Sequence, residues 1–284
     1  MIEKTPEKVR VMTSLFRCPI CASPLEREGR TYRCPAGHSY DVSREGYVHL
    51  LPANQKHAKD PGDDKTMAAA RSRFLDSGAY IPLRETLERL AVSHTGPAPA
   101  VLDAGCGEGY YTAGILTALK GAGKKPKLAG VDLSKPSLKK AARRAPDAEF
   151  AVASVYRLPL ADHSVELVVN CFSPLALEEF LRVLKPGGTY LYVTPAARHL
   201  WELKEVLYDR PYLNKEESIP YEGLVYEEVV PVTAPFRAEG EVLQSLFRMT
   251  PYYWKTPKAG AQRLTALERL DITADFRVHV FHRE

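Results

Sequence analysis

The sequence contains no apolar stretch that approaches the roughly 20 residues needed to cross a bilayer as a helix. Its first 17 residues, MIEKTPEKVRVMTSLFR, are interrupted by charges and lack the apolar run of about 7–15 residues typical of a secretory signal. The charge excess is small, with 39 lysines and arginines against 35 aspartates and glutamates. Such a balance permits contact with an anionic polymer but does not require it. We therefore expect a cytoplasmic protein with no membrane partner.

Cysteine is also scarce, with five residues in 284, and cytoplasmic thiols normally stay reduced. Three of the five lie near the start in two close pairs, Cys18-x2-Cys21 and Cys34-x3-His38. Two pairs of soft ligands on tight turns predict a tetrahedral structural zinc site, with a disulfide plus a free thiol as the alternative. A module of about 40 residues has too small a core to fold alone, so the metal would supply folding energy. Between the pairs, PLEREGRTYR with Gly29 in its middle predicts a hairpin.

Glycines gather in one segment, AVLDAGCGEGYY. An apolar run, Ala100–Ala104, is followed by Gly105, Gly107 and Gly109 and then by a helical pattern. Glycines in this place allow a tight strand-to-helix turn and a close approach of a ligand to the backbone. Asp132 ends the next apolar run, 23 residues after Gly109, and an acidic residue there suits hydrogen bonds to ribose hydroxyls. The spacing predicts a site for a nucleotide-type cofactor.

Apolar runs and helical patterns alternate through the rest of the chain. AEFAVASV, VELVVNCFS and GGTYLYVTP are further strand candidates, with helical stretches such as KPSLKKAARRAP and PLALEEFLRVLKPGG between some of them. This alternation predicts an α/β fold with a parallel, doubly wound, Rossmann-like sheet. The segment DFRVHVFHRE at the C-terminus alternates apolar and polar residues, which predicts an antiparallel edge strand.

Two helices are expected before the first strand of this sheet. Asp63 or Asp64 can cap a helix through Met67–Leu75, which Gly78 would end, and a second helix would begin near Tyr80.

Four segments resemble the class I S-adenosylmethionine-dependent methyltransferases: VLDAGCGEGYY, GVDLS, ASVYRLPLADHSVELVV and FLRVLKPGGTYLYVTP. A dehydrogenase would instead carry G-x-G-x-x-G/A, and LKPGG before the last of these strands favours a methyltransferase. The resemblance implies that the Asp103–Gly109 loop holds the methionine end of S-adenosylmethionine. It further implies that Asp132 binds the ribose and that Ser154 and Val155 flank the adenine.

The first 90 residues add a more specific likeness. CPIC, CPAGH, EGYVHLLP, KDPGD, ARSRFLDSGAYIPLR and, further on, TPAARHLWELK resemble the bacterial 23S ribosomal RNA guanine-N1 methyltransferases, the RlmA family. This resemblance implies methylation of N1 of a guanine in a domain II hairpin of 23S rRNA, by a homodimer with an RNA-binding cleft. It implies structural zinc on Cys18, Cys21, Cys34 and His38. Additional cofactor contacts would be Tyr80, Glu108, Gly109 and His199.

The expected organisation is therefore a class I methyltransferase sheet with a small N-terminal zinc-binding module. Residues 1–48 would form the zinc-binding RNA-recognition module, 49–96 a helical linker, and 97–284 the methyltransferase domain. Two other functions stay open, a small-molecule methyltransferase and a non-catalytic zinc RNA-binding protein. The separate zinc module argues against the first, and the intact DAGCGEG loop with its following acid argues against the second.

The chemistry of the acceptor is less well defined. Asn170–Pro174 lacks the double proline typical of enzymes that methylate exocyclic amines, and Cys171 lacks the context of a pyrimidine-carbon nucleophile. Asp162, Asn170 and Glu178 lie near expected strand ends, but no catalytic base is singled out. The aromatic run Tyr252–Trp254 could stack on a flipped base or pack in the core.

Overall fold

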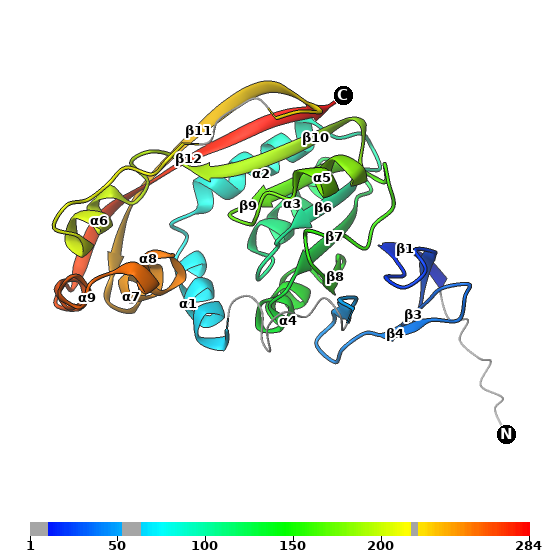
Figure 1. Cartoon of the computed structure of the whole chain (residues 1–284), viewed down its shortest axis with the longest axis horizontal. Coiled ribbons are helices and arrows are strands. Elements are labelled where there is room, and N and C mark those ends of the chain that lie inside the picture. Colours follow the sequence, from blue (N-terminus) through cyan, green and yellow to red (C-terminus); the bar gives the residue numbers. More distant parts are fainter. Residues whose placement is uncertain (1–10, 53–63, 217–220) are drawn as a thin grey trace.

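The computed structural model describes residues 11–52, 64–216 and 221–284 and contains two sheets (Figure 1). A four-stranded sheet near the N-terminus has the order β1-β2-β3-β4, and an eight-stranded sheet has the order β11-β12-β10-β9-β6-β7-β8-β5. The strands of the small sheet are β1 (Val11–Arg17), β2 (Pro24–Glu28), β3 (Thr31–Arg33) and β4 (Ser39–Asp41). Those of the large sheet are β5 (Val48–His49), β6 (Ala100–Ala104), β7 (Lys127–Asp132), β8 (Glu149–Val152), β9 (Val165–Cys171), β10 (Leu184–Pro195), β11 (Leu224–Glu239) and β12 (Arg269–Arg283).

The helices are α1 (Lys65–Asp76), α2 (Ile81–Ser93), α3 (Tyr110–Gly121), α4 (Lys135–Arg144), α5 (Leu177–Val183), α6 (Trp201–Leu207), α7 (Gly240–Met249), α8 (Tyr252–Lys255) and α9 (Lys258–Thr265). Asp64, one of the two expected caps, accepts a hydrogen bond from Met67 N at 2.8 Å, while Asp63 lies outside the described residues. Gly78, with φ +86°, follows α1, and Tyr80 is the N-cap of α2. None of the helices in the described ranges is long and apolar enough to span a membrane.

The doubly wound parallel sheet is confirmed. Six strands, from β10 through β5, are parallel to their neighbours, and β6 to β10 match the five apolar runs of the sequence. The C-terminal strand β12 is antiparallel, as expected, but the prediction that it forms the edge is wrong because β11 pairs with it on the outer side. Pro231 and Pro235 within β11 obscure its strand pattern, and an edge strand is the place where proline is tolerated.

One connection of the large sheet, residues 153–164 between β8 and β9, contains no helix. The N-terminal module (residues 11–42) packs on this side of the sheet instead. Phe16, Leu25 and Tyr32 are almost completely buried, in the same apolar cluster as Val131 of β7 and Val168 of β9. The module therefore shares its core with the large sheet, which compensates for its small size.

Polar contacts fix the module on the sheet. Glu149 of β8 accepts hydrogen bonds from Leu15 N at 3.0 Å and from the Tyr32 hydroxyl at 2.9 Å. Arg17 N donates to Pro159 O at 2.8 Å in the helix-free connection. Since β5 also pairs with β8, the chain enters the large sheet directly after the module. The expected boundaries at residues 48 and 96 stay a prediction.

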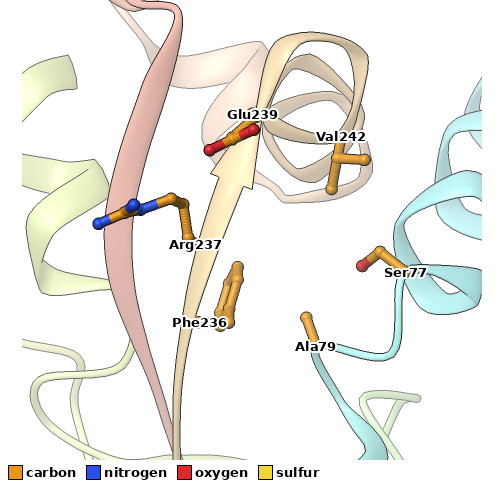
Figure 2. A pocket seen from close by; sticks show the side chains of 6 residues that line it. All are labelled: Ser77, Ala79, Phe236, Arg237, Glu239 and Val242. Atoms are coloured by element: carbon orange, nitrogen blue, oxygen red, sulfur yellow. The ribbon is translucent and has the colours of Figure 1, made fainter.

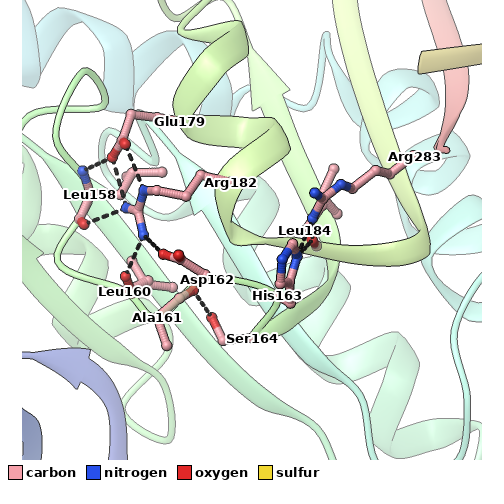
Figure 3. Close-up of polar contacts among 10 residues, drawn as sticks. All are labelled: Leu158, Leu160, Ala161, Asp162, His163, Ser164, Glu179, Arg182, Leu184 and Arg283. Carbon is pink, nitrogen blue, oxygen red and sulfur yellow. Dashed lines mark hydrogen bonds and ion pairs between the residues drawn. The ribbon is translucent and has the colours of Figure 1, made fainter. Parts of the chain in front are cut away.

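A guanidinium from α5 holds the helix-free connection in shape (Figure 3). Arg182 donates to Leu158 O and Leu160 O, both at 2.9 Å, and pairs with Glu179 and Asp162 at 2.7 Å. This pairing lowers the pKa of Asp162. Because Asp162 lies just before β9 begins, it sits at the opposite end of the parallel strands from their carboxyl termini. That position removes it from the candidates for a catalytic base.

We expect the substitution Phe16→Ala to destabilise the whole chain and not only the module. Truncation of a fully buried phenylalanine costs about 3–5 kcal/mol of unfolding free energy, and this ring lies in the core shared with the sheet. Urea unfolding followed by tryptophan fluorescence measures the effect, since Trp201 and Trp254 lie outside the module. Met12→Ala, on the same strand but with a side chain 54% exposed, is the matched control. An unchanged tryptophan midpoint in Phe16→Ala would contradict the shared core.

Candidate metal centre and cofactor site

Four candidate zinc ligands converge in the N-terminal module. Ligand atoms of Cys18, Cys21, Cys34 and His38 all lie within 4.8 Å of one another. His38 Nδ1 is 3.3 Å from Cys34 Sγ and 3.6 Å from Cys18 Sγ, and the sulfurs of Cys21 and Cys34 are 3.7 Å apart. Ligands bound to a tetrahedral zinc ion at about 2.0–2.3 Å lie roughly 3.3–3.8 Å apart. The observed separations fit such an ion.

Two tight turns present these ligands. Ala22 N donates to Cys18 O at 2.8 Å, and Gly37 N donates to Cys34 O at 3.0 Å, where Gly37 has φ +86°. The Tyr40 hydroxyl, 3.0 Å from Cys18 Sγ, can donate to the metal-bound thiolate and so orient it. All five cysteines are free, and no pair is at the roughly 2.05 Å of a disulfide bond. The geometry favours a Cys3His zinc centre over the disulfide alternative.

The glycine-rich loop leaves its backbone open to a ligand. Gly105 and Gly107 have φ of +78° and +53°, in the left-handed region. A Cβ at Gly105 would lie 2.2 Å from Ser173 Cβ, so this position tolerates only glycine. A Cβ at Gly107 would meet no atom within 4 Å, which leaves space for a bound group beside the backbone. The loop thus has the cradle that a cofactor requires.

The other predicted cofactor residues lie at the same edge of the sheet. Asp132, at the end of β7, accepts hydrogen bonds from Gly107 N at 2.9 Å and from Ser134 N at 2.7 Å. Its carboxylate therefore joins the glycine loop to the start of α4. Ser154 and Val155 follow the end of β8 after one intervening residue, and the carboxyl ends of parallel strands share one edge. The assignment of these residues to ribose and adenine stays a prediction.

Asp103, the last residue but one of β6, is buried. It accepts a hydrogen bond from the Thr112 hydroxyl, and burial raises its pKa to about 7. A positively charged group bound nearby would favour the ionised form of this carboxyl. The Glu108 carboxylate contacts two helices. It accepts hydrogen bonds from Ser72 of α1 and from Arg144 of α4, the latter at 2.7 Å. The cofactor contact implied for Glu108 stays a prediction.

Tyr80 and His199, distant in the sequence, come together in an aromatic cluster. Their ring centroids are 6.4 Å apart, and both pack on Phe276, at 4.9 and 4.7 Å. The residue pattern alone places His199 on a helix surface, but it is buried, and burial lowers its pKa to about 4. His199 is therefore neutral at pH 7. Only the fold could reveal this neighbourhood, because β12 supplies Phe276.

Two residues at this site were missed by sequence reasoning. Phe172, directly after β9, has φ +59°, which L-residues other than glycine rarely adopt, and its side chain is 44% exposed. The hydroxyl of Tyr111, in the first turn of α3, is buried, and its one hydrogen-bond partner among the described residues is the Cys171 thiol, a weak one. It also lies near Tyr80. A weakly satisfied hydroxyl beside the glycine loop fits a site completed by a ligand.

The Phe172 conformation is held by its neighbours. The Ser173 hydroxyl donates to Ala104 O at 2.6 Å, and Ser173 N donates to Asn170 Oδ1 at 3.3 Å. The Asn170 amide in turn donates to Pro174 O at 3.1 Å. Because its amide group shapes the loop, Asn170 is no longer a candidate for the base.

The run Tyr252–Trp254 divides between packing and exposure. Tyr252 is partly buried and packs on Tyr208, with ring centroids 6.4 Å apart. Trp254 is 69% exposed, and Tyr253 stands against it at 5.0 Å. The packing alternative therefore holds for Tyr252, while stacking on a base stays a prediction for the exposed Trp254.

A hollow of about 290 Å³ opens where the α1–α2 turn meets β11 and α7 (Figure 2). Its Arg237 is already paired with Asp271, at 2.7 and 3.0 Å. The lining residues are Ser77, Ala79, Phe236, Arg237, Glu239 and Val242. None of them is a predicted zinc or cofactor residue, so this hollow is a packing junction next to the site.

Comparisons with known proteins match both the zinc-binding module and the methyltransferase sheet. The family model of the RlmA N-terminal zinc ribbon matches residues 16–59, and that of a methyltransferase domain matches residues 101–188. The YcgJ protein of Bacillus subtilis, a solved structure 17% identical, covers 70% of this chain and 98% of its own, with a TM-score of 0.50. That likeness supports the fold alone.

Two curated relatives are more informative. The 23S rRNA (guanine(748)-N(1))-methyltransferase of Streptomyces fradiae is 43% identical over 195 residues, 68% of this chain and 67% of the relative. YxjB of Bacillus subtilis (strain 168), provisionally named a 23S rRNA (guanine-N(1)-)-methyltransferase, is 33% identical over 278 residues. That match covers 92% of this chain and 95% of YxjB.

We expect Asp103→Asn to change how stability depends on pH. With a folded-state pKa of about 7 against roughly 3.9 in the unfolded chain, the native state binds more protons between these values. The free energy of unfolding therefore falls as pH rises from 4 to 7 and levels off above 7. Asparagine does not titrate and removes this fall. The stability of the variant relative to the parent should therefore increase as pH rises to 7. The variant should also bind S-adenosylmethionine more weakly.

Urea unfolding of the cofactor-free protein from pH 5 to 8, with calorimetry of cofactor binding, measures both effects. Asp147→Asn, at an exposed carboxylate paired with Lys120, is the control. A constant difference between Asp103→Asn and the parent at every pH would contradict the raised pKa.

Proposed function

We propose a substrate site and a reaction geometry for this chain, which belongs to the family of 23S rRNA (guanine-N1)-methyltransferases. The protein is an S-adenosylmethionine-dependent enzyme that methylates N1 of a guanine in 23S rRNA, and it carries a structural zinc ion. One observation carries this function. The chain combines a Cys3His module, which shares the core of the large sheet, with a glycine loop that has space for a ligand. A small-molecule methyltransferase would need only the second of these.

The residues at the carboxyl edge of the sheet would hold the cofactor. When bound, S-adenosylmethionine supplies an electrophilic methyl group on a sulfonium centre. We place its methionine end along the Asp103–Gly109 loop, its ribose on Asp132, and its adenine between Ser154 and Val155. The buried carboxyl of Asp103 would ionise next to the positive charge, and the Tyr111 hydroxyl would gain a stronger partner than the Cys171 thiol.

Phe172 is our candidate for the residue that receives the flipped guanine. Its exposed ring follows β9 at the carboxyl edge and lies 5.6 Å from Phe276 and 6.5 Å from His199. A left-handed backbone at a non-glycine residue costs roughly 1–2 kcal/mol and is often found at functional sites. Stacking on this ring would fix the Watson–Crick edge, and thus N1, toward the methyl group. Such positioning supplies much of the rate in a bimolecular transfer.

The N-terminal module would bind the RNA that surrounds this guanine. A groove of about 250 Å³ between the module and the helix-free connection is lined in part by Arg17 and Arg157. Arg157 is exposed and lies two residues after Val155, so phosphates in the groove would run close to the expected adenine site. Trp254 could offer a further stacking surface.

The finer substrate is also a proposal. We place the guanine in a domain II hairpin loop of 23S rRNA, and at the position equivalent to guanine 748, because the Streptomyces fradiae relative is named for that nucleotide. A loop nucleotide is at least partly unpaired, so that extruding it costs little. A homodimer that encloses the RNA is part of the same proposal, and light scattering with and without the hairpin measures it.

A labelled transfer reaction tests the function. Purified protein, a deuterated-methyl cofactor and an unmodified domain II hairpin should yield labelled 1-methylguanosine, which mass spectrometry of digested nucleosides detects. Fragment mapping should place it at the equivalent of position 748. Cofactor binding without any labelled nucleoside, even from whole ribosomal RNA, would favour a small-molecule acceptor. Absence of cofactor binding would favour a non-catalytic RNA-binding protein.

We expect Phe172→Gly to fold at least as well as the parent while methylating poorly. Glycine relieves the left-handed strain but removes the ring, and base stacking on an aromatic is worth about 1–3 kcal/mol. The rate of RNA methylation should therefore fall by roughly 5- to 150-fold in Phe172→Gly. Phe172→Trp, which keeps an aromatic ring, should retain most of the activity. Single-turnover methylation and thermal unfolding of the three proteins measure this. Full activity of Phe172→Gly would exclude the stacking role.

A further inference from the structure

A second cluster of metal-type ligands lies far from the N-terminal module. His94 follows α2, Glu227 belongs to β11, and His282 belongs to β12, yet one ligand atom of each lies within 4.8 Å of the other two. Glu227 Oε2 is 2.6 Å from His282 Nε2 and 3.8 Å from His94 Nδ1. Three segments that are distant in the sequence thus converge on one point at the β11–β12 edge of the large sheet.

A backbone irregularity presents the carboxylate to the two histidines. The pairing of β11 with β12 shifts register between Tyr226 and Glu228, so that Glu227 is the extra residue of a β-bulge. A bulge breaks the alternation of side chains and re-aims the extra residue. Two residues earlier, Val225 is paired with His282. Glu227 follows Val225 by two residues, so its side chain lies on the side of His282, and the bulge leaves Glu227 without a partner residue on β12.

A contact on its second ring nitrogen orients one of the two imidazoles, and the other ring lies beside it. His282 Nδ1 is 3.4 Å from the Thr189 hydroxyl on β10, a contact that leaves Nε2 to face Glu227. The His94 ring lies 5.7 Å from the His282 ring, and His94 N donates to Leu90 O at 3.0 Å at the end of α2. A hydrogen bond on the second ring nitrogen is the usual way to orient a metal-binding histidine.

The ion pair between Glu227 and His282, at 2.6 Å, involves only two of the three residues and gives no role to His94, whose Nδ1 lies 3.8 Å from the same oxygen. Two imidazole nitrogens and a carboxylate oxygen, by contrast, form a ligand set that zinc and similar divalent ions accept, with a fourth position left for water. Ligands around such an ion lie roughly 3.4 Å apart, so that small side-chain rotations suffice.

We propose that His94, Glu227 and His282 form a second metal-binding site, for a borderline divalent cation of the Zn²⁺ class. It differs from the Cys3His centre in chemistry, since it contains no sulfur. It also differs in place, because strand order puts β11 at one edge of the large sheet and β5, next to the N-terminal module, at the other. An ion there would tie the end of α2 to the edge strand β11 and to its neighbour β12.

A metal titration of the untagged full chain, with a metal ion already bound at the Cys3His centre, tests this site. Cobalt(II) should bind as a second equivalent, with visible d–d absorption but without new thiolate charge-transfer absorption. Glu227→Gln and His282→Asn should each weaken this second equivalent at least 10-fold. Glu228→Gln, which removes the same charge from the neighbouring exposed residue of β11, should bind like the parent.

The parent protein decides the question even if a variant folds poorly. Absence of a second equivalent in the parent at millimolar cobalt would overturn the proposal. Retention of full affinity in folded Glu227→Gln and His282→Asn would do the same, because it would place the ion elsewhere. Thermal unfolding gives an independent readout: the second equivalent should raise the Tm of the parent and of Glu228→Gln, but not that of the other two variants.

Discussion

The packing of the N-terminal module on the large sheet, beside the helix-free connection between β8 and β9, is the interaction on which the rest of the structure depends. Phe16, Leu25 and Tyr32 fill the space that a helix between β8 and β9 would otherwise occupy. Zinc closes the turns of the module, Glu149 anchors its strands, and Arg182 shapes the connection beneath it. The zinc centre and the glycine-rich loop are thereby held on one core.

At its carboxyl edge, the large sheet places two aspartates in different environments. Asp103 is buried with a raised pKa, while Asp132 links two loops through backbone hydrogen bonds. In the proposed site, Asp103 would ionise when the cationic cofactor arrives, and Asp132 would accept hydrogen bonds from the ribose hydroxyls. Phe172 is strained beside them, and its neighbours Asn170 and Ser173 hold the strain in place. The proposed acceptor side thus follows β9, and the proposed cofactor side follows β6 and β7.

Local sequence patterns predicted much of this architecture. The features that escaped prediction depend on contacts between residues that are distant in the sequence. Apolar runs located β6 to β10, and ligand spacing located the zinc centre, because both signals lie within short segments. The strand β11 escaped prediction because its prolines are acceptable only at an edge, and an edge is a property of the whole sheet. Residues such as Tyr80 and His199 become neighbours only through Phe276 of β12. The left-handed conformation of Phe172 leaves no trace in residue type.

The central claim, that the module and the methyltransferase sheet form one cooperative unit, has a direct test. Cobalt in the Cys3His centre gives thiolate absorption that reports on the module alone, while Trp201 and Trp254 report on the rest of the chain. Both signals should be followed through one urea titration. The shared core predicts that the two transitions coincide. Loss of the thiolate absorption at clearly lower urea, with tryptophan fluorescence unchanged, would contradict it.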